Sequence, residues 1–275
     1  MSIEEGTFDI TKDLCDEIST MICRYWCSNQ DDKRKMHWIS WNKLTDPKGE
    51  GGLGFRDIHT LNLAMLAKQG WRLIHNHGSL CARVLKARYY TNGDVLKANA
   101  GRNMSYTWRS ILKGIDVMKK GIIWRVGNRS RINIWSDPWL PREWSRKPIT
   151  PRWHNVLGWV EELINPITGT WDVDLIRQTF WQQDVDTILS ILVHQDLDDI
   201  VAWHFDNRGI FSVKSAYRVQ RNHEKRSSRG ELQHHLVENL CLIFNGRRFG
   251  HLSVQVKSST LCGVLHTTVW LWGEF

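Results

Sequence analysis

A chain of 275 residues that is 41% hydrophobic and 24% charged has the composition of a folded globular protein, with room for one large or two ordinary domains. No stretch reaches the roughly 18 consecutive apolar residues of a membrane span, and the acidic N-terminus lacks the apolar core of a signal peptide. We therefore expect an intracellular protein, in the nucleus or the cytoplasm, whose six scattered cysteines are reduced thiols and not a disulfide framework.

The formal net charge of +8 is unevenly distributed. Residues 31–150 carry 23 Lys and Arg against 9 Asp and Glu, a net charge of +14, whereas residues 151–200 carry 2 against 9. A block this basic attracts polyanions, because each phosphate that Lys or Arg neutralises releases condensed counterions. A solvated basic surface without a specific partner is the alternative, and charge alone leaves both open.

The first predicted element is an amphipathic helix over residues 9–26. Apolar side chains recur there at spacings of three and four, which predicts a stripe packed on a core: Ile10, Leu14, Ile18, Met21, Ile22 and Tyr25. The charge run Asp31 to Lys35 and the Gly- and Pro-rich segment up to Phe55 then predict a turn-rich connection, with a short extended piece around Trp38 to Trp41.

Three further helices are expected in the basic block. The stretch "GGLGFRDIHTLNLAMLAKQGWRL" turns from glycines into a helical pattern at Asp57, a second helix covers about 80–90, and a third covers about 105–118 with Ser105 as N-cap. All three interleave Arg and Lys with aromatic residues. That pattern suits a surface that stacks bases and binds phosphates, but Trp at helical spacing is more typical of a core, which we favour.

The stretch "GIIWRVGNRSRINIWSDPWLP" predicts a β-hairpin over residues 121–136. Two runs rich in Ile, Val and Trp flank "GNRS", so Trp124 and Trp135 are expected to pair across the hairpin. Arg125, Arg129 and Arg131 would then cluster near the turn, either to bind phosphates or as an ordinary solvated tip.

The acidic region after residue 150 predicts three short helices, in "WVEELI", "WDVDLIRQTF" and "DVDTILSIL". Residues 200–213 then predict a second hairpin around "DNRG", followed by a helix that opens at Ser212 or Ser215. The expected fold class is therefore α+β, mainly helical, with short β-hairpins near 121–136 and 200–213 and a disordered or poorly packed C-terminal tail.

The chain offers little chemistry. The glycines of "GGLGF" lack the spacing of a dinucleotide-binding loop, and no P-loop, GxSxG or HExxH motif occurs. We interpret Asp198 and Asp199 as local caps and not as polymerase carboxylates. Cys23 and Cys27 with His37 supply half a metal site at most. We expect no metal, no cofactor and no small-molecule substrate.

Four segments in order carry a family resemblance: "KRKMHWISWNKLTDPKGEGGLGFRDIHTLNLAMLAKQGWRLI", "SYTWRSILKG", "GIIWRVGNRSRINIWSDPWLP" and "DDIVAWHFDNRGIFSVKSAYRV". Together they resemble the part of plant LINE-type (non-LTR) retrotransposon polyproteins that follows the reverse transcriptase core, over residues 8–222. The resemblance implies that the chain begins beyond the polymerase palm. It therefore implies a chain that is not an enzyme, since the metal-binding Asp pair of the palm and any endonuclease or RNase H motif have no counterpart.

The resemblance also implies a division of the chain. Residues 1–50 would be the end of the reverse-transcriptase-like region, a thumb or connection helix and loop, and residues 51–150 a basic, Trp-rich helical region with a hairpin. Residues 151–222 would be an acidic helical region that leads into a truncated start of the reverse transcriptase zinc-binding domain. The Cys and His ligands of that domain are missing, and residues 223–275 have an unrelated character. Trp26 and Cys27 also stand where the family usually has Trp-Gly.

Two interpretations follow. One is a non-catalytic fragment of a retrotransposon polyprotein with at most weak, non-specific RNA or DNA binding. The other is a host-used nucleic-acid-binding or protein-interaction module derived from such an element. No membrane contact is expected in either. The candidate nucleic-acid-binding residues are Lys33, Arg34, Lys35, Arg72, Arg83, Lys86, Arg88, Arg125, Arg129 and Arg131.

A frameshift or mispredicted exon boundary between about Ser227 and Asn245 would explain the unrelated tail. Back-translation of Asn245 to Phe275 with permissible codons, read from the third base of the Asn245 codon, allows a string that resembles the start of the missing zinc-binding domain. We predict that the nucleotide sequence, read in all three frames, continues the family pattern beyond "FSVKSAYRV" in another frame. If no frame continues it, the frameshift hypothesis is wrong.

Overall fold

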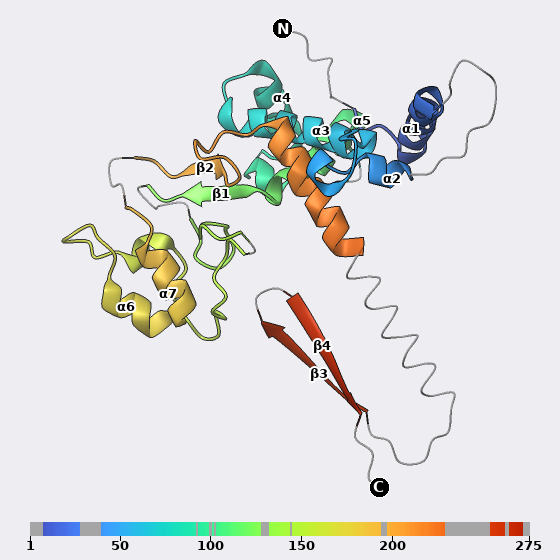
Figure 1. The fold of residues 1–275 in the computed structure, drawn as a ribbon. Helices are drawn as coiled ribbons and strands as arrows, with labels where there is room; N and C mark the ends of the chain where they lie inside the picture. Colours follow the sequence, from blue (N-terminus) through green and yellow to red (C-terminus); the bar gives the residue numbers. More distant parts are fainter. Residues whose placement is uncertain are drawn as a thin grey trace. The chain divides into compact units, whose positions relative to one another are not determined.

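The structure, a computed structural model, describes residues 8–27, 40–91, 93–98, 101, 103–127, 132–143, 145–193, 197–228, 254–261 and 264–271. The chain divides into two compact units: Met1–Pro141 with Ser145–Asn222, and Arg142–Trp144 with His223–Phe275. The first unit contains the elements from α1 to β2, and the second contains strands β3 and β4 (Figure 1).

The described chain is mainly helical, with one small antiparallel sheet in the first unit, which confirms the expected fold class. Its α-helices are α1 Lys12–Cys27, α2 Trp41–Leu44, α3 Ile58–His75, α4 Leu80–Tyr89, α5 Tyr106–Lys119, α6 Val173–Thr179 and α7 Gln182–Leu189, and residues 213–228 are also helical. The 3-10 helices are η1 Lys48–Glu50, η2 Val95–Lys97 and η3 Val160–Leu163. The strands are β1 Ile122–Arg125, β2 Ile200–Trp203, β3 Val254–Leu261 and β4 Val264–Leu271.

The helices of the basic block begin where capping side chains predict. The Asp57 carboxylate accepts a hydrogen bond from the Thr60 N–H at the start of α3, and the Ser105 hydroxyl accepts one from the Trp108 N–H at the start of α5. Ser212 accepts in the same way from the Ser215 N–H, so the last predicted helix does open at Ser212. Each cap satisfies a backbone donor that the first turn of a helix leaves unpaired.

The close approach of α3 and α5 organises the first hydrophobic core. A Cβ on Gly114 of α5 would lie only 2.3 Å from the Leu66 carbonyl carbon and 2.5 Å from the Ala67 nitrogen, so the α5 backbone rests directly on α3. Gly70 of α3 similarly faces Ile115, whose Cγ1 would lie 2.9 Å from an added Cβ. The missing side chains allow the two helices to pack more closely than larger residues would permit.

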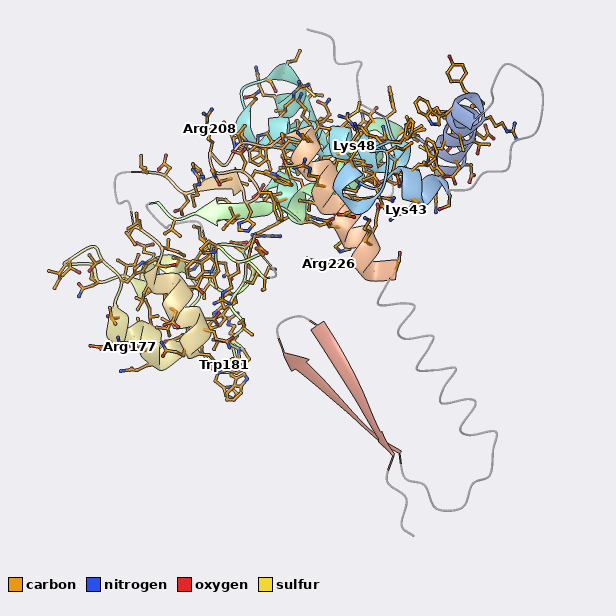
Figure 2. All side chains as sticks on the ribbon, in the orientation of Figure 1. Lys43, Lys48, Arg177, Trp181, Arg208 and Arg226 are labelled. Carbon is orange, nitrogen blue, oxygen red and sulfur yellow. The ribbon has the colours of Figure 1, made fainter. Side chains whose placement is uncertain are left out.

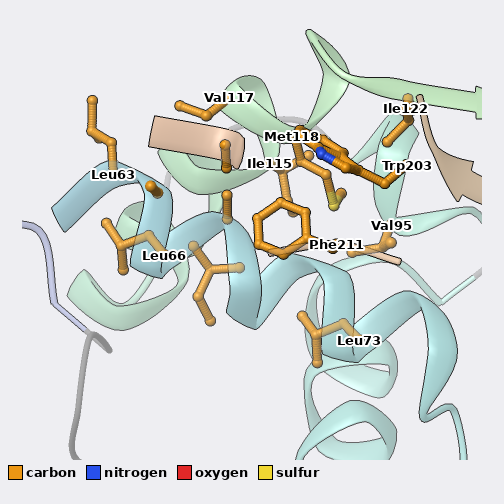
Figure 3. Close-up of a cluster of buried hydrophobic side chains, with 14 of the residues drawn as sticks. Leu63, Leu66, Leu73, Val95, Ile115, Val117, Met118, Ile122, Trp203 and Phe211 are labelled. Atoms are coloured by element: carbon orange, nitrogen blue, oxygen red, sulfur yellow. The ribbon is translucent and has the colours of Figure 1, made fainter. Parts of the chain in front are cut away.

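Aromatic side chains complete this core (Figure 3). Trp108 and Trp203 are fully buried, and the Trp203 indole N–H donates to the Ser215 hydroxyl at 2.8 Å. Phe211 packs edge-on against Trp203 with ring centroids 4.8 Å apart. Trp139 is also buried, in a second cluster. The core interpretation, which concerned the tryptophans of the three helices, is confirmed for Trp108.

The sheet corrects the predicted hairpins. Strand β1 pairs antiparallel with β2, which lies far along the chain, so Trp124 is the register partner of Val201 and not of Trp135. The segment expected to return from the first hairpin folds into a turn instead, because the Asn133 carboxamide oxygen accepts hydrogen bonds from the N–H groups of Trp135 and Ser136. The predicted turn "GNRS" falls largely on residues 128–131, which lie outside the described residues.

The second hairpin is correct in its turn and wrong in its returning strand. Gly209 adopts a left-handed backbone with φ 75°, and its carbonyl oxygen accepts a hydrogen bond from the Trp203 N–H at 2.9 Å. Residues 210–212 then continue without strand structure into the helix. Strand β2 pairs instead with β1 along its other edge, where the His204 N–H donates to the Gly121 carbonyl.

Helix α1 forms as predicted, but its apolar stripe is not buried. Leu14, Met21 and Tyr25 are 46%, 61% and 83% exposed, whereas Cys15 and Ser19 are buried. The preceding segment is fixed to α3 by the Asn62 carboxamide, whose oxygen accepts from the Ile10 N–H and whose nitrogen donates to the Phe8 carbonyl. These polar contacts, together with the small side chains of Cys15 and Ser19, determine which face of α1 turns inward.

The acidic region forms the three predicted short helices, η3, α6 and α7, around a second core. The buried members of this core are Val126, Ile132, Ile134, Trp139, Leu140, Val160, Leu163, Ile176, Phe180, Val185 and Ile188. The fully buried Asp184 carboxylate accepts hydrogen bonds from the N–H groups of Ile149 and Thr150 and from the Thr150 hydroxyl. A buried carboxylate needs such donors to offset its lost hydration.

The C-terminal tail falls largely outside the described residues. Residues 223–228 are helical, and strands β3 and β4 pair antiparallel from Val254↔Leu271 to Leu261↔Val264. The prediction of a poorly packed tail therefore stays a prediction for the remainder. Among the described helices, none is both long and apolar enough to cross a membrane.

The α3–α5 contact leads to a stability prediction. Gly114→Ala should lower the free energy of unfolding by about 1–3 kcal/mol, because the new methyl group would overlap the α3 backbone and force the helices apart. The higher helix propensity of Ala, about 1 kcal/mol, offsets part of this loss. Urea unfolding followed by circular dichroism measures it. Gly78→Ala is the control, since nothing lies within 4 Å of its added Cβ; equal midpoints for the two variants would contradict the prediction.

Candidate nucleic-acid interface

The ten predicted nucleic-acid-binding residues do not form one described cluster. Five of them lie outside the described residues: Lys33, Arg34, Lys35, Arg129 and Arg131. The others come from three elements, with Arg72 on α3, with Arg83, Lys86 and Arg88 on α4, and with Arg125 on β1. The side chains of the basic block project from several helices and loops, among them Lys43 and Lys48 (Figure 2).

Three of the five described residues contact another group of the chain with their side chains. The Arg72 guanidinium donates to the Gln69 side-chain oxygen at 3.2 Å, and that of Arg125 donates to the Asn207 carbonyl at 3.2 Å. The Arg88 guanidinium lies over the Tyr89 ring, 5.5 Å from its centroid. Lys86 is the predicted residue that lines a cavity in this unit.

This cavity has a volume of ≈ 1260 Å³ and belongs entirely to the first unit. Its walls come from the C-terminal ends of α3 and α5, from α4, from the segment around η2, from β1 and β2, and from segments 136–138 and 145–147. Ligand pockets typically enclose about 300–1,000 Å³, so a ligand of several ring systems fits here.

The cavity lining carries more positive than negative charge. It contains five cationic side chains, those of Lys86, Lys97, Lys119, Arg146 and Lys147, and three carboxylates, those of Asp94, Asp137 and Asp199. In a concave site, low-dielectric walls concentrate the field of such an excess.

Each of the three carboxylates accepts a hydrogen bond from the backbone. Asp94 accepts from the Leu96 N–H at 3.1 Å, Asp137 from the Asn133 N–H at 2.8 Å, and Asp199 from the Gly127 N–H at 2.8 Å. Backbone N–H groups thereby stabilise these negative charges and reduce the need for a cation. Asp199 was interpreted as a local cap, but this hydrogen bond joins it to Gly127, which lies far from it in the sequence.

Three of the lysines lack an acidic partner. Lys86, Lys97 and Lys147 are exposed and form no ion pair with the residues that the structure describes. Lys119 differs, because its ammonium lies 3.5 Å from the Asp116 carboxylate one helical turn earlier. The unpaired ammonium groups are therefore available to an anion in the cavity.

Arg146 is held in the cavity wall by its backbone and its side chain. Its carbonyl oxygen accepts from the N–H groups of Trp139 and Leu140, and its guanidinium donates to the Lys120 carbonyl at the C-terminus of α5. A helix C-terminus is favourable for a cation. Burial lowers the pKa of Arg146 from its ordinary value, but an Arg in a protein remains protonated at neutral pH.

Aromatic rings supply the apolar part of the lining. Tyr90 and Trp124 both line the cavity, and the Tyr90 ring stacks with that of Trp108 at 5.6 Å between ring centroids. Burial raises the pKa of the Tyr90 hydroxyl above its ordinary value, so the ring is neutral at physiological pH. Neutral aromatic faces beside ammonium groups are what a stacked base with its phosphate requires.

His75 is fixed between two carbonyl oxygens at the cavity edge. Its Nδ1 lies 3.1 Å from the Trp71 oxygen and its Nε2 lies 3.2 Å from the Val201 oxygen. The Trp71 ring stacks on the imidazole at 4.1 Å between ring centroids, so the orientation of the imidazole is fixed by these three contacts.

Sequence reasoning missed most of the cavity. These missed cations lie on three separate segments, with Lys97 on one, Lys119 on another and the neighbours Arg146 and Lys147 on a third, and no spacing in the sequence links the segments. The net charge of +14 over residues 31–150 is a signal that includes all of them, but it does not indicate which cations share a cavity. The stretch "SDPWLP" was identified through the family resemblance, and its first three residues line the wall.

The structure describes only part of the group Cys23, Cys27 and His37, which the sequence analysis considered as half of a metal site. Cys23 is half-buried, whereas the side chain of Cys27 and the whole of His37 lie outside the described residues. Within the described ranges, no three His, Cys, Asp or Glu side chains come together as a metal site requires.

Two curated plant proteins are similar to this chain. The uncharacterized mitochondrial protein AtMg00310 of Arabidopsis thaliana is 35% identical over 143 residues, which are 52% of this chain and 93% of that protein. The chain belongs to the family of this protein. The putative ribonuclease H protein At1g65750 of the same plant is 31% identical over 205 residues, 68% of this chain but only 31% of that protein.

These relatives are consistent with a plant retrotransposon-derived sequence. No known family profile matches the chain, and no solved structure is similar to it. The alignment with the putative ribonuclease H protein leaves most of that protein uncovered, so its activity does not transfer to this chain.

Proposed function

We propose that the chain is a non-catalytic fragment of a plant LINE-type retrotransposon polyprotein that binds RNA or DNA weakly and without sequence preference. The observation that carries the binding proposal is the group of three lysines, Lys86, Lys97 and Lys147, that line a cavity without acidic partners among the described residues. Lysine ammonium groups bind phosphates as point charges, and contacts to phosphates carry no sequence information, so the binding should be insensitive to sequence.

The family assignment of the fragment is supported by the order of its motifs. The four quoted segments follow one another as they do after the reverse transcriptase core of LINE-type polyproteins, and we place the truncated start of the zinc-binding domain before residue 222. The chain's first compact unit also ends at Asn222, and the second begins again at His223. This boundary lies shortly before the interval from about Ser227 to Asn245 in which we place the change of reading frame.

One observation favours the alternative of a host-used module. The aligned segment makes up 93% of the mitochondrial protein AtMg00310, so a segment of this kind exists as nearly all of a separate protein. A single intact, spliced and expressed locus would favour the module, and many near-identical, interrupted copies would favour the fragment.

The binding should depend steeply on salt. A labelled single-stranded oligonucleotide titrated with the full chain should bind with a dissociation constant of about 10⁻⁴–10⁻⁶ M at physiological salt, and the logarithm of affinity should fall linearly with the logarithm of salt concentration. Oligonucleotides of unrelated sequence should bind equally. Fluorescence anisotropy at several salt concentrations measures both effects, and an affinity that ignores salt would contradict electrostatic binding.

The purified chain should also lack polymerase activity and stoichiometric zinc. With a primed template, deoxynucleotides and magnesium, no primer extension is expected, because the sequence contains no counterpart of the palm Asp pair. Elemental analysis should find no zinc in proportion to protein, because the ligand cluster of the zinc-binding domain is missing from the sequence. One zinc per chain would overturn the prediction about zinc. Primer extension that is absent from a heat-inactivated control would overturn the prediction about polymerase activity.

A further inference from the structure

We propose that the cavity is the specific place at which the chain holds a single strand of nucleic acid, with at least one base inside it. This inference rests on the proposed nucleic-acid binding and deepens it, because it names both the site and the form of the ligand. The alternatives are a diffuse basic surface and a site for double helices.

The charge pattern of the cavity selects an anion. The three carboxylates in the lining already accept backbone hydrogen bonds, whereas Lys86, Lys97 and Lys147 have no acidic partner among the residues described. A ligand with several negative charges would pair with all three lysines at once. A phosphodiester chain supplies them at regular intervals.

The shape and the rings of the cavity select a single strand. Phosphate binding alone needs only surface cations, but this site is hollow and places Tyr90 and Trp124 in the same lining as the lysines. In a double helix the bases are stacked on one another, and only their edges are open to a protein. A single strand can turn a base into the cavity, where an aromatic ring can stack on it.

Cations outside the cavity provide a matched control. Lys48, Arg177 and Arg208, labelled in Figure 2, are exposed and lie outside the lining. A triple variant Lys48→Ala, Arg177→Ala, Arg208→Ala therefore removes the same charge as Lys86→Ala, Lys97→Ala, Lys147→Ala without touching the cavity.

The test measures binding of a fluorescein-labelled oligothymidylate of twelve nucleotides to the full chain and to both triple variants, over a range of salt concentrations. The slope of log affinity against log salt concentration is negative, and in the cavity variant its magnitude should fall by about 2. Each of the three lost phosphate contacts with a single strand contributes about 0.7 to it. The control variant should keep the wild-type slope to within about 0.7, the contribution of one contact. Thermal melting checks that both variants are folded.

Two further ligands test the form of the nucleic acid with the unaltered chain. An abasic strand of the same length keeps the phosphates and should bind about five- to tenfold more weakly, which corresponds to the loss of one stacked base. A duplex of twelve base pairs should compete more weakly than the single strand, although it carries more phosphates.

The outcomes separate this inference from the proposed function. Equal slope losses in the two triple variants, or equal binding of the abasic strand or the duplex, would overturn the cavity proposal and leave general nucleic-acid binding in place. Failure of the unaltered chain to bind any of these strands would overturn the proposed binding function and the cavity proposal together.

Discussion

The direct contact of the α5 backbone with α3 at Gly114 is the constraint on which the rest of the first unit depends. It fixes the relative positions of two long helices, and through them the positions of their C-terminal ends. The cavity lining includes Leu73 and His75 at the C-terminal end of α3 and Lys119 at the C-terminal end of α5. A glycine buried in the core thus helps to determine where cations stand at the surface, because close-packed helices transmit small displacements along their length.

The second determinant is the pairing of β1 with β2, which joins parts of the chain that are distant in sequence. Ile122 is in register with Trp203, and on the opposite edge of β1 the Trp124 N–H donates to the Pro138 carbonyl at 2.7 Å. This arrangement brings the turn around Asn133 and the loop of Arg146 to the cavity wall. Contacts of such long sequence separation cost more chain entropy to close than helical contacts do, so the cavity depends on the least local part of the fold.

The same distinction explains what the sequence could and could not predict. The longer helices depend on residues three or four positions apart, and they were predicted correctly. Ser105 was predicted as a cap, Asp57 as the start of a helical pattern, and Ser212 as one of two possible starts. The partner of β1 was wrong, since alternation of apolar residues marks a strand without identifying its neighbour. The stripe of α1 was predicted to be buried, yet Met21 is 61% exposed, because periodicity defines a face but not its contact. The cavity lysines follow no period. Lys86 was a named candidate, but only the +14 charge of the block indicated Lys97, Lys119 and Lys147.

The unpaired lysines also connect the cavity with the stability of the fold. Like charges that share a concave, low-dielectric surface repel one another, and this repulsion destabilises the unliganded state. The carboxylates in the lining offset only part of it, since backbone N–H groups already share their charge. Any polyanion that enters the cavity removes the repulsion and binds the folded chain in preference to the unfolded one, so binding and folding must strengthen each other.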